Sequence, residues 1–135
     1  MQRKNLTIGV FGFGCVGQGL YDVLSRTQGL KVHIKKIGIK DATKTRNLPA
    51  HYFTTNRDEI LFDPEIDVVV ELINDEHAAF EIVSTALRNG KAVVSASAIG
   101  WYGADTDPVR PFTEDDAADD SFLGQTCKLW EESIE

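Results

Sequence analysis

Cysteine is scarce in this sequence, and long apolar runs are absent from it. Two cysteines in 135 residues do not make the disulfide framework of a small secreted domain. No uninterrupted apolar stretch is long enough to cross a bilayer. Residues 1–5 lead directly into an apolar strand, without the pattern of a signal peptide. We therefore expect a cytoplasmic protein that has no membrane partner.

The sequence also lacks a metal-binding pattern and an excess of basic residues. Its three histidines, His33, His51 and His77, are dispersed and show no ligand spacing with one another or with the cysteines. Acidic residues outnumber basic ones by 21 to 14, which gives a formal net charge of −7. Nucleic-acid binding requires a basic face, so we predict neither a metal site nor a nucleic-acid partner.

The acidic charge is concentrated at one end of the chain. Residues 1–97 hold 12 basic and 11 acidic residues, whereas residues 98–135 hold 2 basic and 10 acidic ones. This difference marks a change of character near residue 97. Hydrophobic residues make up 42% of the chain, which is typical of a folded protein. We predict a folded domain over residues 1–97 and an acidic segment over residues 98–135 that packs onto it.

A glycine-rich turn is the most informative feature of the sequence. The apolar run Leu6–Phe11 leads into Gly12-Phe-Gly14-Cys-Val-Gly17, and an amphipathic segment follows. Gly12 permits a sharp turn, Gly14 lets backbone amides approach a pyrophosphate, and Gly17 lets the next helix pack closely on the strand. The N-terminus of that helix offers free N–H groups and a positive dipole end to phosphates. The segment predicts a dinucleotide-binding turn, and a glycine-rich turn without a ligand is the alternative.

Strand-like and helix-like segments alternate along residues 6–96. We expect strands and helices in the order 6–11, 17–26, 32–39, 52–53, 58–61, 67–72, 78–89 and 91–96, of which 17–26, 58–61 and 78–89 are the helices. This alternation predicts an α/β fold, a Rossmann-like doubly wound parallel sheet in a single domain. Ligands of such sheets bind at the rim formed by the strand ends. Farther along, we expect a strand end and loop over 97–103, a loop over 105–120 and a helix over 122–134.

Polar residues stand at the ends of two predicted strands. Lys40 follows the second strand, where a basic residue accommodates the 2′-phosphate of NADP and an acidic one favours NAD. The lysine favours NADP slightly, and NAD stays open as the cofactor. Glu71 ends a buried strand, and we expect it to cap a helix or bond the backbone rather than act as a general base. Residues 74–76 are expected to form the loop and cap into the next helix.

Several motifs outside the glycine turn carry further information. Together with the run Gly9–Gly19, they are Lys40-Asp41 with Arg46, Thr54-Thr55, Asp63–Ile73 and Ala86–Ala96. In combination they resemble the N-terminal nucleotide-binding domain of homoserine dehydrogenase, a family that reduces aspartate semialdehyde to homoserine with NAD(P)H. The resemblance implies that Lys40 lies by the adenosine ribose and Ile73 beside the cofactor. It implies a pyrophosphate site formed by Gly12, Gly14, Cys15, Val16 and Gly17.

Two departures from that family's pattern concern the chemistry. The family continues after its last strand with Asn-Lys, and the lysine serves the active site, whereas this sequence has Ser97-Ala98. Asn74-Asp75 stands where the family has Gly-Gly. A chain of this length also has no room for the substrate-binding and dimerisation portion. We predict an NAD(P)-binding module with no catalytic residue of its own. The alternative is an oxidoreductase or epimerase that needs segments missing from this chain.

The acidic end of the chain resembles a different family. Residues 95–103, 111–114 and 122–131 are similar to a central part of an NAD-dependent epimerase/dehydratase family, the atypical extended short-chain dehydrogenases. Ser97 would match that family's active-site serine, and we count it among the cofactor-binding residues. We therefore expect a truncated or chimeric chain, joined near residues 92–97. A folded chimera without enzymatic function stays an alternative, and self-association through a sheet edge is also expected.

Overall fold

The computed structural model describes residues 5–96, 99–102 and 112–132. The chain divides into two compact units, Met1–Ser95 and Ala96–Glu135, and each unit is described by itself. Ser97, which the sequence suggests for the cofactor site, lies outside the described residues. The prediction that residues 98–135 pack onto the first domain stays a prediction.

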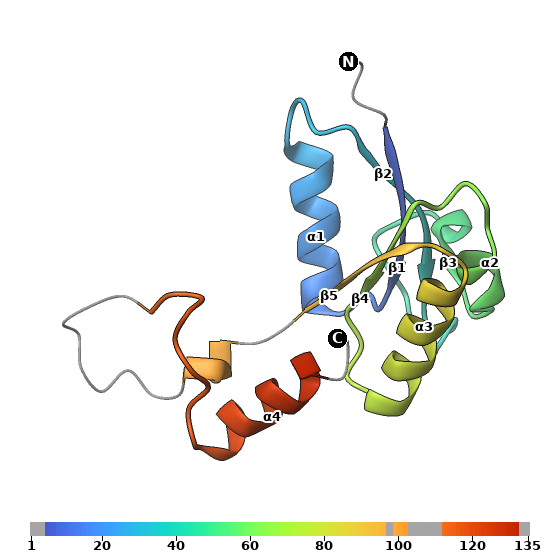
Figure 1. Ribbon diagram of the computed structural model, residues 1–135. Helices are drawn as coiled ribbons and strands as arrows, with labels where there is room; N and C mark the ends of the chain where they lie inside the picture. Colours follow the sequence, from blue (N-terminus) through green and yellow to red (C-terminus); the bar gives the residue numbers. More distant parts are fainter. Residues whose placement is uncertain (1–4, 97–98, 103–111, 133–135) are drawn as a thin grey trace. The chain divides into compact units, whose positions relative to one another are not determined.

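The first unit is a five-stranded parallel sheet with helices on both faces (Figure 1). Its strands are β1 Leu6–Phe11, β2 Val32–Gly38, β3 Phe53–Thr54, β4 Val68–Glu71 and β5 Ala92–Ser95. Its helices are α1 Cys15–Arg26, α2 Asp58–Leu61, α3 Glu76–Arg88 and the short 3₁₀ helix η1 Ala50–Tyr52. The strand order is β3-β2-β1-β4-β5, and all neighbouring strands run parallel. The predicted Rossmann-like α/β fold is therefore confirmed.

Apolar residues of the sheet form two core layers, one on each face. Successive side chains of a strand point to opposite faces, and β4 is apolar on both. Val69 is fully buried in a cluster with Ile60 of α2 and Ile82 of α3. Val70 belongs to the other cluster, against which Leu20 of α1 packs. This double burial explains why the Val68–Val70 run forms a central strand.

Both long helices of the first unit begin two residues before the predicted position. Helix α1 begins at Cys15 because Gly14 is its extended N-cap residue. Helix α3 begins at Glu76 because the Asp75 carboxylate caps it, accepting a 3.1 Å hydrogen bond from the Ala78 backbone N–H. The predicted cap within residues 74–76 is thus confirmed. Within the described parts of the chain, no helix is long and apolar enough to cross a membrane.

The second unit contains a 3₁₀ helix, η2 Ile99–Tyr102, and a helix, α4 Phe122–Glu132. The prediction of a strand end and loop over 97–103 is therefore wrong for residues 99–102. The backbone oxygen of Trp101 accepts a hydrogen bond from the Asp119 N–H at 2.8 Å, and the Trp101 indole N–H donates to the backbone oxygen of Asp116 at 3.0 Å. These bonds join segments far apart in sequence, so the local pattern did not reveal them.

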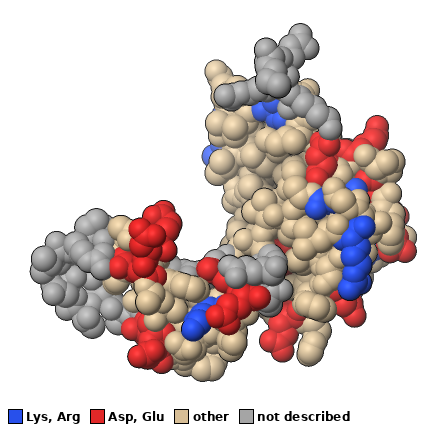
Figure 2. Space-filling model, viewed as in Figure 1, with Lys and Arg blue, Asp and Glu red and all other residues tan. Residues whose placement is uncertain are grey.

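Among the charged side chains on the described surface of the second unit, acidic ones predominate in the view of Figure 2. Lys128 is the one basic residue among residues 99–102 and 112–132, and it pairs with Glu132 at 3.9 Å. The first unit carries both signs on the same face (Figure 2). The uneven charge of the sequence is thus also a property of the folded surface.

Candidate functional site

A groove of about 720 Å³ lies in the first unit, at the ends of β1, β2 and β4. Its walls come from the glycine turn, from the loop after β2, from the start of α2, from the segment after β4 and from one face of α3. The site residues that line it are Gly12, Gly14, Lys40 and Ile73. Strand order reverses beside β1, so the groove occupies the place where open α/β sheets bind ligands.

Two glycines of the turn are required by the fold itself. Gly12 has a φ of 103°, and a Cβ on it would lie 2.7 Å from the backbone oxygen of Leu72. Gly17 is buried, and a Cβ there would lie 2.4 Å from the Gly12 oxygen. The turn therefore packs tightly between α1 and the segment that follows β4. These contacts agree with the predicted roles of the two residues in turning the chain and in packing the helix.

No contact within the protein requires a glycine at position 14. Gly14 is the N-cap residue of α1 and has no side chain to cap the helix. A Cβ on it would meet no heavy atom within 4 Å. The first turn of α1 contains no acidic residue, and its Cys15 and Val16 are exposed. The helix N-terminus thus presents backbone N–H groups and a positive dipole end to an open, lined space. That arrangement suits an anionic group.

Lys40 lies on the side of the groove formed by β2, and it has a partner that the sequence did not suggest. Its Nζ donates a 2.8 Å hydrogen bond to Oδ2 of Asp75, the residue that caps α3. Hydrogen bonds from Lys40 and from the Ala78 backbone N–H hold the pKa of Asp75 below its ordinary value. The pair joins the segment after β2 to the segment after β4, and β1 lies between these strands.

Two further cations of the groove are also engaged. Arg46 lies 5.2 Å above the ring of Phe53 and donates to the Lys44 backbone oxygen. Arg57 forms a 2.8 Å ion pair with Glu81 of α3. Stacking and pairing hold these long side chains against the wall of the groove, whose lining also includes Lys44 and the acidic Asp41.

Glu71 is 1% exposed, and its carboxylate bonds the segment after β4, which forms the other side of the groove. Oε1 accepts a 2.6 Å hydrogen bond from the Ile73 backbone N–H, and Oε2 accepts a 2.8 Å bond from the Ser95 hydroxyl. The prediction of a backbone-bonding role is confirmed. Glu71 thus fixes the segment in which Ile73 lines the groove, and both its oxygens are occupied by these structural bonds.

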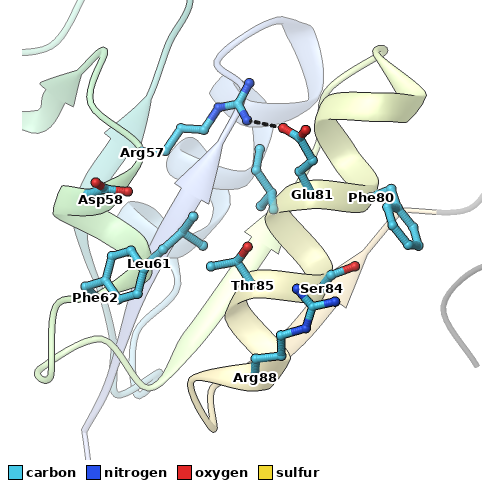
Figure 3. A pocket seen from close by; sticks show the side chains of 10 residues that line it. Arg57, Asp58, Leu61, Phe62, Phe80, Glu81, Ser84, Thr85 and Arg88 are labelled. Atoms are coloured by element: carbon cyan, nitrogen blue, oxygen red, sulfur yellow. Dashed lines mark hydrogen bonds and ion pairs between the residues drawn. The ribbon is translucent and has the colours of Figure 1, made fainter.

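A second, smaller cavity of about 340 Å³ lies between α2 and α3 (Figure 3). It shares Arg57 and Ile82 with the groove, and the Arg57–Glu81 pair stands at its edge. None of its lining residues belongs to the glycine turn. The described residues also hold no group of three or more histidine, cysteine or acidic side chains placed for a metal ion. The groove at the strand ends is therefore the candidate site.

Sequence comparison with known proteins points to homoserine dehydrogenase. A model of the homoserine dehydrogenase NAD-binding domain matches residues 12–106. The homoserine dehydrogenase of Bacillus subtilis is 34% identical over 103 residues, covering 70% of this chain and 24% of the relative. That of Synechocystis is 35% identical over 105 residues, covering 71% and 24%. The chain thus spans about a quarter of the length of these relatives.

Solved structures of homoserine dehydrogenases also align with the chain. A homoserine dehydrogenase from Thiobacillus denitrificans aligns with a TM-score of 0.62 and 35% identity, over 68% of this chain and 23% of that one. The enzyme from S. aureus aligns with a TM-score of 0.63 and 31% identity, over 69% and 26%. The family match runs past residue 96, where the sequence motifs suggested that the resemblance ends. The resemblance of the acidic end to the epimerase/dehydratase family stays a prediction.

Proposed function

The chain belongs to the family of the homoserine dehydrogenase NAD-binding domain, and on this premise we propose that its groove binds an NAD(P) dinucleotide. The observation that carries the proposal is the open space in front of Gly14. Packing within the protein does not require a glycine at this position, but close approach of a pyrophosphate to the backbone does. The fold provides that approach at an uncapped helix N-terminus.

The walls of the groove suggest how the dinucleotide would lie. The pyrophosphate would rest on the turn from Gly12 to Gly17, with Cys15 and Val16 beside it. The adenosine half would lie toward Lys40, because the residue after the second strand of such folds reads the ribose. The nicotinamide half would lie toward Ile73, whose segment Glu71 holds in place. When bound, NAD(P)H supplies a hydride.

Between the two dinucleotides, we propose that NADP is slightly preferred. The support is Lys40, a basic side chain at the place where a 2′-phosphate would lie. Lys44 and Arg46, which also line the groove, add positive charge on the same side, where Asp41 adds one negative charge.

We further propose that this chain alone does not have homoserine dehydrogenase activity. The family's active-site lysine has no counterpart, because Ser97-Ala98 stands at its place in the sequence. A hydride donor without a positioned acceptor gives no catalysis. Oxidation of NADPH by aspartate semialdehyde in the presence of this chain would overturn this expectation. It would then favour an oxidoreductase, alone or with a partner chain.

Three sequence-based expectations stay proposals. Self-association through a sheet edge has β5 as its candidate, since β5 ends the strand order and its Val94 is 55% exposed. Light scattering after size-exclusion chromatography would show a dimer if this edge pairs.

A chimeric origin of the acidic end and a cytoplasmic location are supported only by the sequence patterns that suggested them.

Titration of the purified chain with NADP⁺ and NAD⁺ by calorimetry tests the binding proposal. We expect saturable binding, and we expect Gly14→Asp to weaken it at least about tenfold, because a carboxylate would fill the pyrophosphate space and repel its charge. Gly19→Asp is the matched control: it adds the same charge on the same helix, also at a position open to solvent. No binding of either dinucleotide at millimolar concentration would refute the proposal.

A further inference from the structure

We propose that Asp75 is a specificity-determining residue, which competes with the 2′-phosphate of NADP for Lys40 and so lowers the preference for NADP over NAD. This inference rests on the proposed function. The inference concerns the ratio of the affinities for NADP and NAD, whereas the proposed function concerns whether a dinucleotide binds at all. Different results would therefore refute the two proposals.

The contact that supports the inference is the ion pair across the end of β1. Lys40 follows β2 and Asp75 follows β4, with β1 between these strands. The two side chains nevertheless meet, with Nζ and Oδ2 2.8 Å apart. Lys40 lines the groove beside the glycine turn. Lys40, the basic residue expected to hold a 2′-phosphate after β2, is thus already paired with a carboxylate from the opposite side.

The competition is selective because only one of the two dinucleotides needs the free ammonium group. A 2′-phosphate carries more negative charge than a carboxylate at neutral pH, and it must displace Asp75 or share Lys40 with it. The ribose of NAD has a neutral hydroxyl there, which makes no such demand. Removal of the Asp75 carboxylate charge frees Lys40 for the phosphate, so it should strengthen NADP binding and leave NAD binding nearly unchanged.

The second role of Asp75 does not explain its charge. Its Oδ1 caps α3 by accepting from the Ala78 N–H, and asparagine caps helices as well as aspartate does. Asp75→Asn therefore keeps the cap acceptor and removes only the charge that faces Lys40. The effect is limited in size, because the side chains of Lys40 and Asp75 are 72% and 38% exposed and solvent screens such pairs.

Dissociation constants of NADP⁺ and NAD⁺, measured by calorimetry for the full chain and its variants, test the inference. We expect Asp75→Asn to raise the affinity for NADP⁺ about two- to fivefold and to leave that for NAD⁺ unchanged. Glu76→Gln is the matched control, since it removes an equal charge from the next residue, whose side chain is 91% exposed and does not contact Lys40. We expect no change of the NADP/NAD ratio in this variant.

A double variant separates competition for Lys40 from a general charge effect. In a Lys40→Met background, Asp75→Asn should no longer change the ratio of the two affinities. An equal gain for both dinucleotides, an equal effect of Glu76→Gln, or a persistent effect without Lys40 would each overturn the role of Asp75. Absence of binding in every variant would instead refute the proposed function, and the inference with it.

Discussion

Glu71 and Ser95 are paired residues of neighbouring strands, and a hydrogen bond of 2.8 Å joins their side chains at the ends of β4 and β5. The other carboxylate oxygen of Glu71 holds the Ile73 backbone N–H. One buried side chain therefore ties β5 and the segment after β4 to each other. The shape of the groove on this side depends on an acid that has no cation as a hydrogen-bond partner in the described structure.

Replacement of Glu71 by alanine should destabilise the first unit by about 1 to 3 kcal/mol, because it leaves two part-buried donors without acceptors. Ser95→Ala removes one of the two bonds and should cost about 1 kcal/mol. Urea unfolding curves give both values. A Glu71→Ala variant as stable as Ser95→Ala would show that the Ile73 amide finds another partner.

Two glycines of α1 should respond to alanine in opposite ways. Gly17→Ala places a methyl group 2.4 Å from the Gly12 backbone oxygen, so it should cost about 1 to 3 kcal/mol and weaken dinucleotide binding. Gly19 is exposed within the same helix and its Cβ would meet nothing. Gly19→Ala should stabilise the protein by about 0.5 to 1 kcal/mol. Thermal unfolding of the pair checks this, and equal shifts would contradict the packing argument.

Acid should remove the stability that Asp75 contributes. Hydrogen bonds from Lys40 and the Ala78 N–H lower the pKa of Asp75 in the folded protein from its ordinary value of 3.8. A carboxyl group with a lowered pKa stabilises the fold above its unfolded pKa and loses that contribution as the pH falls through the folded pKa. The difference in unfolding free energy between the parent chain and Asp75→Asn should be constant above about pH 5 and shrink below pH 3.8.

Urea unfolding at a series of pH values measures this difference. In a Lys40→Met background the acid-dependent part should be smaller, because the largest cause of the lowered pKa is then gone. A difference that stays constant through the acid range would show that the pair does not form in solution.

The rate at which Cys15 is chemically modified should report whether a dinucleotide occupies the glycine turn. It is exposed at the first turn of α1, whereas Cys127 is buried. A maleimide reagent should modify Cys15 first, and NADP⁺ should slow that modification in proportion to the occupied fraction. Adenosine, which has no pyrophosphate, is the control and should not protect. Mass spectrometry of peptides follows the reaction, and equal rates with and without a bound dinucleotide would place the pyrophosphate elsewhere.

Local patterns predicted most elements of the first unit. The bounds of β1 and α2 agree with the sequence expectation, because an apolar run and a short amphipathic turn are signals within a few residues. The start of α3 depended on a capping aspartate, which is also a local device. The 3₁₀ helix at residues 99–102 was not predicted, because Trp101 is held by partners near residue 119.

The sequence predicted residues of the site but not the contacts between their side chains. The glycine turn and Lys40 were identified from their places after strands, and the structure brings Gly12, Gly14, Lys40 and Ile73 to one groove. Gly17 lies beneath the turn, and Cys15 and Val16 are exposed at its side. The Asp75 partner of Lys40 lies 35 residues away, and periodicity contains no information about such a contact.

Local patterns were enough to predict a parallel α/β unit and the position of its glycine turn, because strand and helix periods and the backbone needs of glycine are local properties. The atoms around the turn became known only from the fold: a Cβ on Gly17 would meet the Gly12 oxygen, whereas one on Gly14 would meet no atom. The ion pair between Lys40 and Asp75 likewise became known only from the fold. The strand order explains this pair: with β1 between β2 and β4, residues far apart in the chain end on one rim, where their side chains meet.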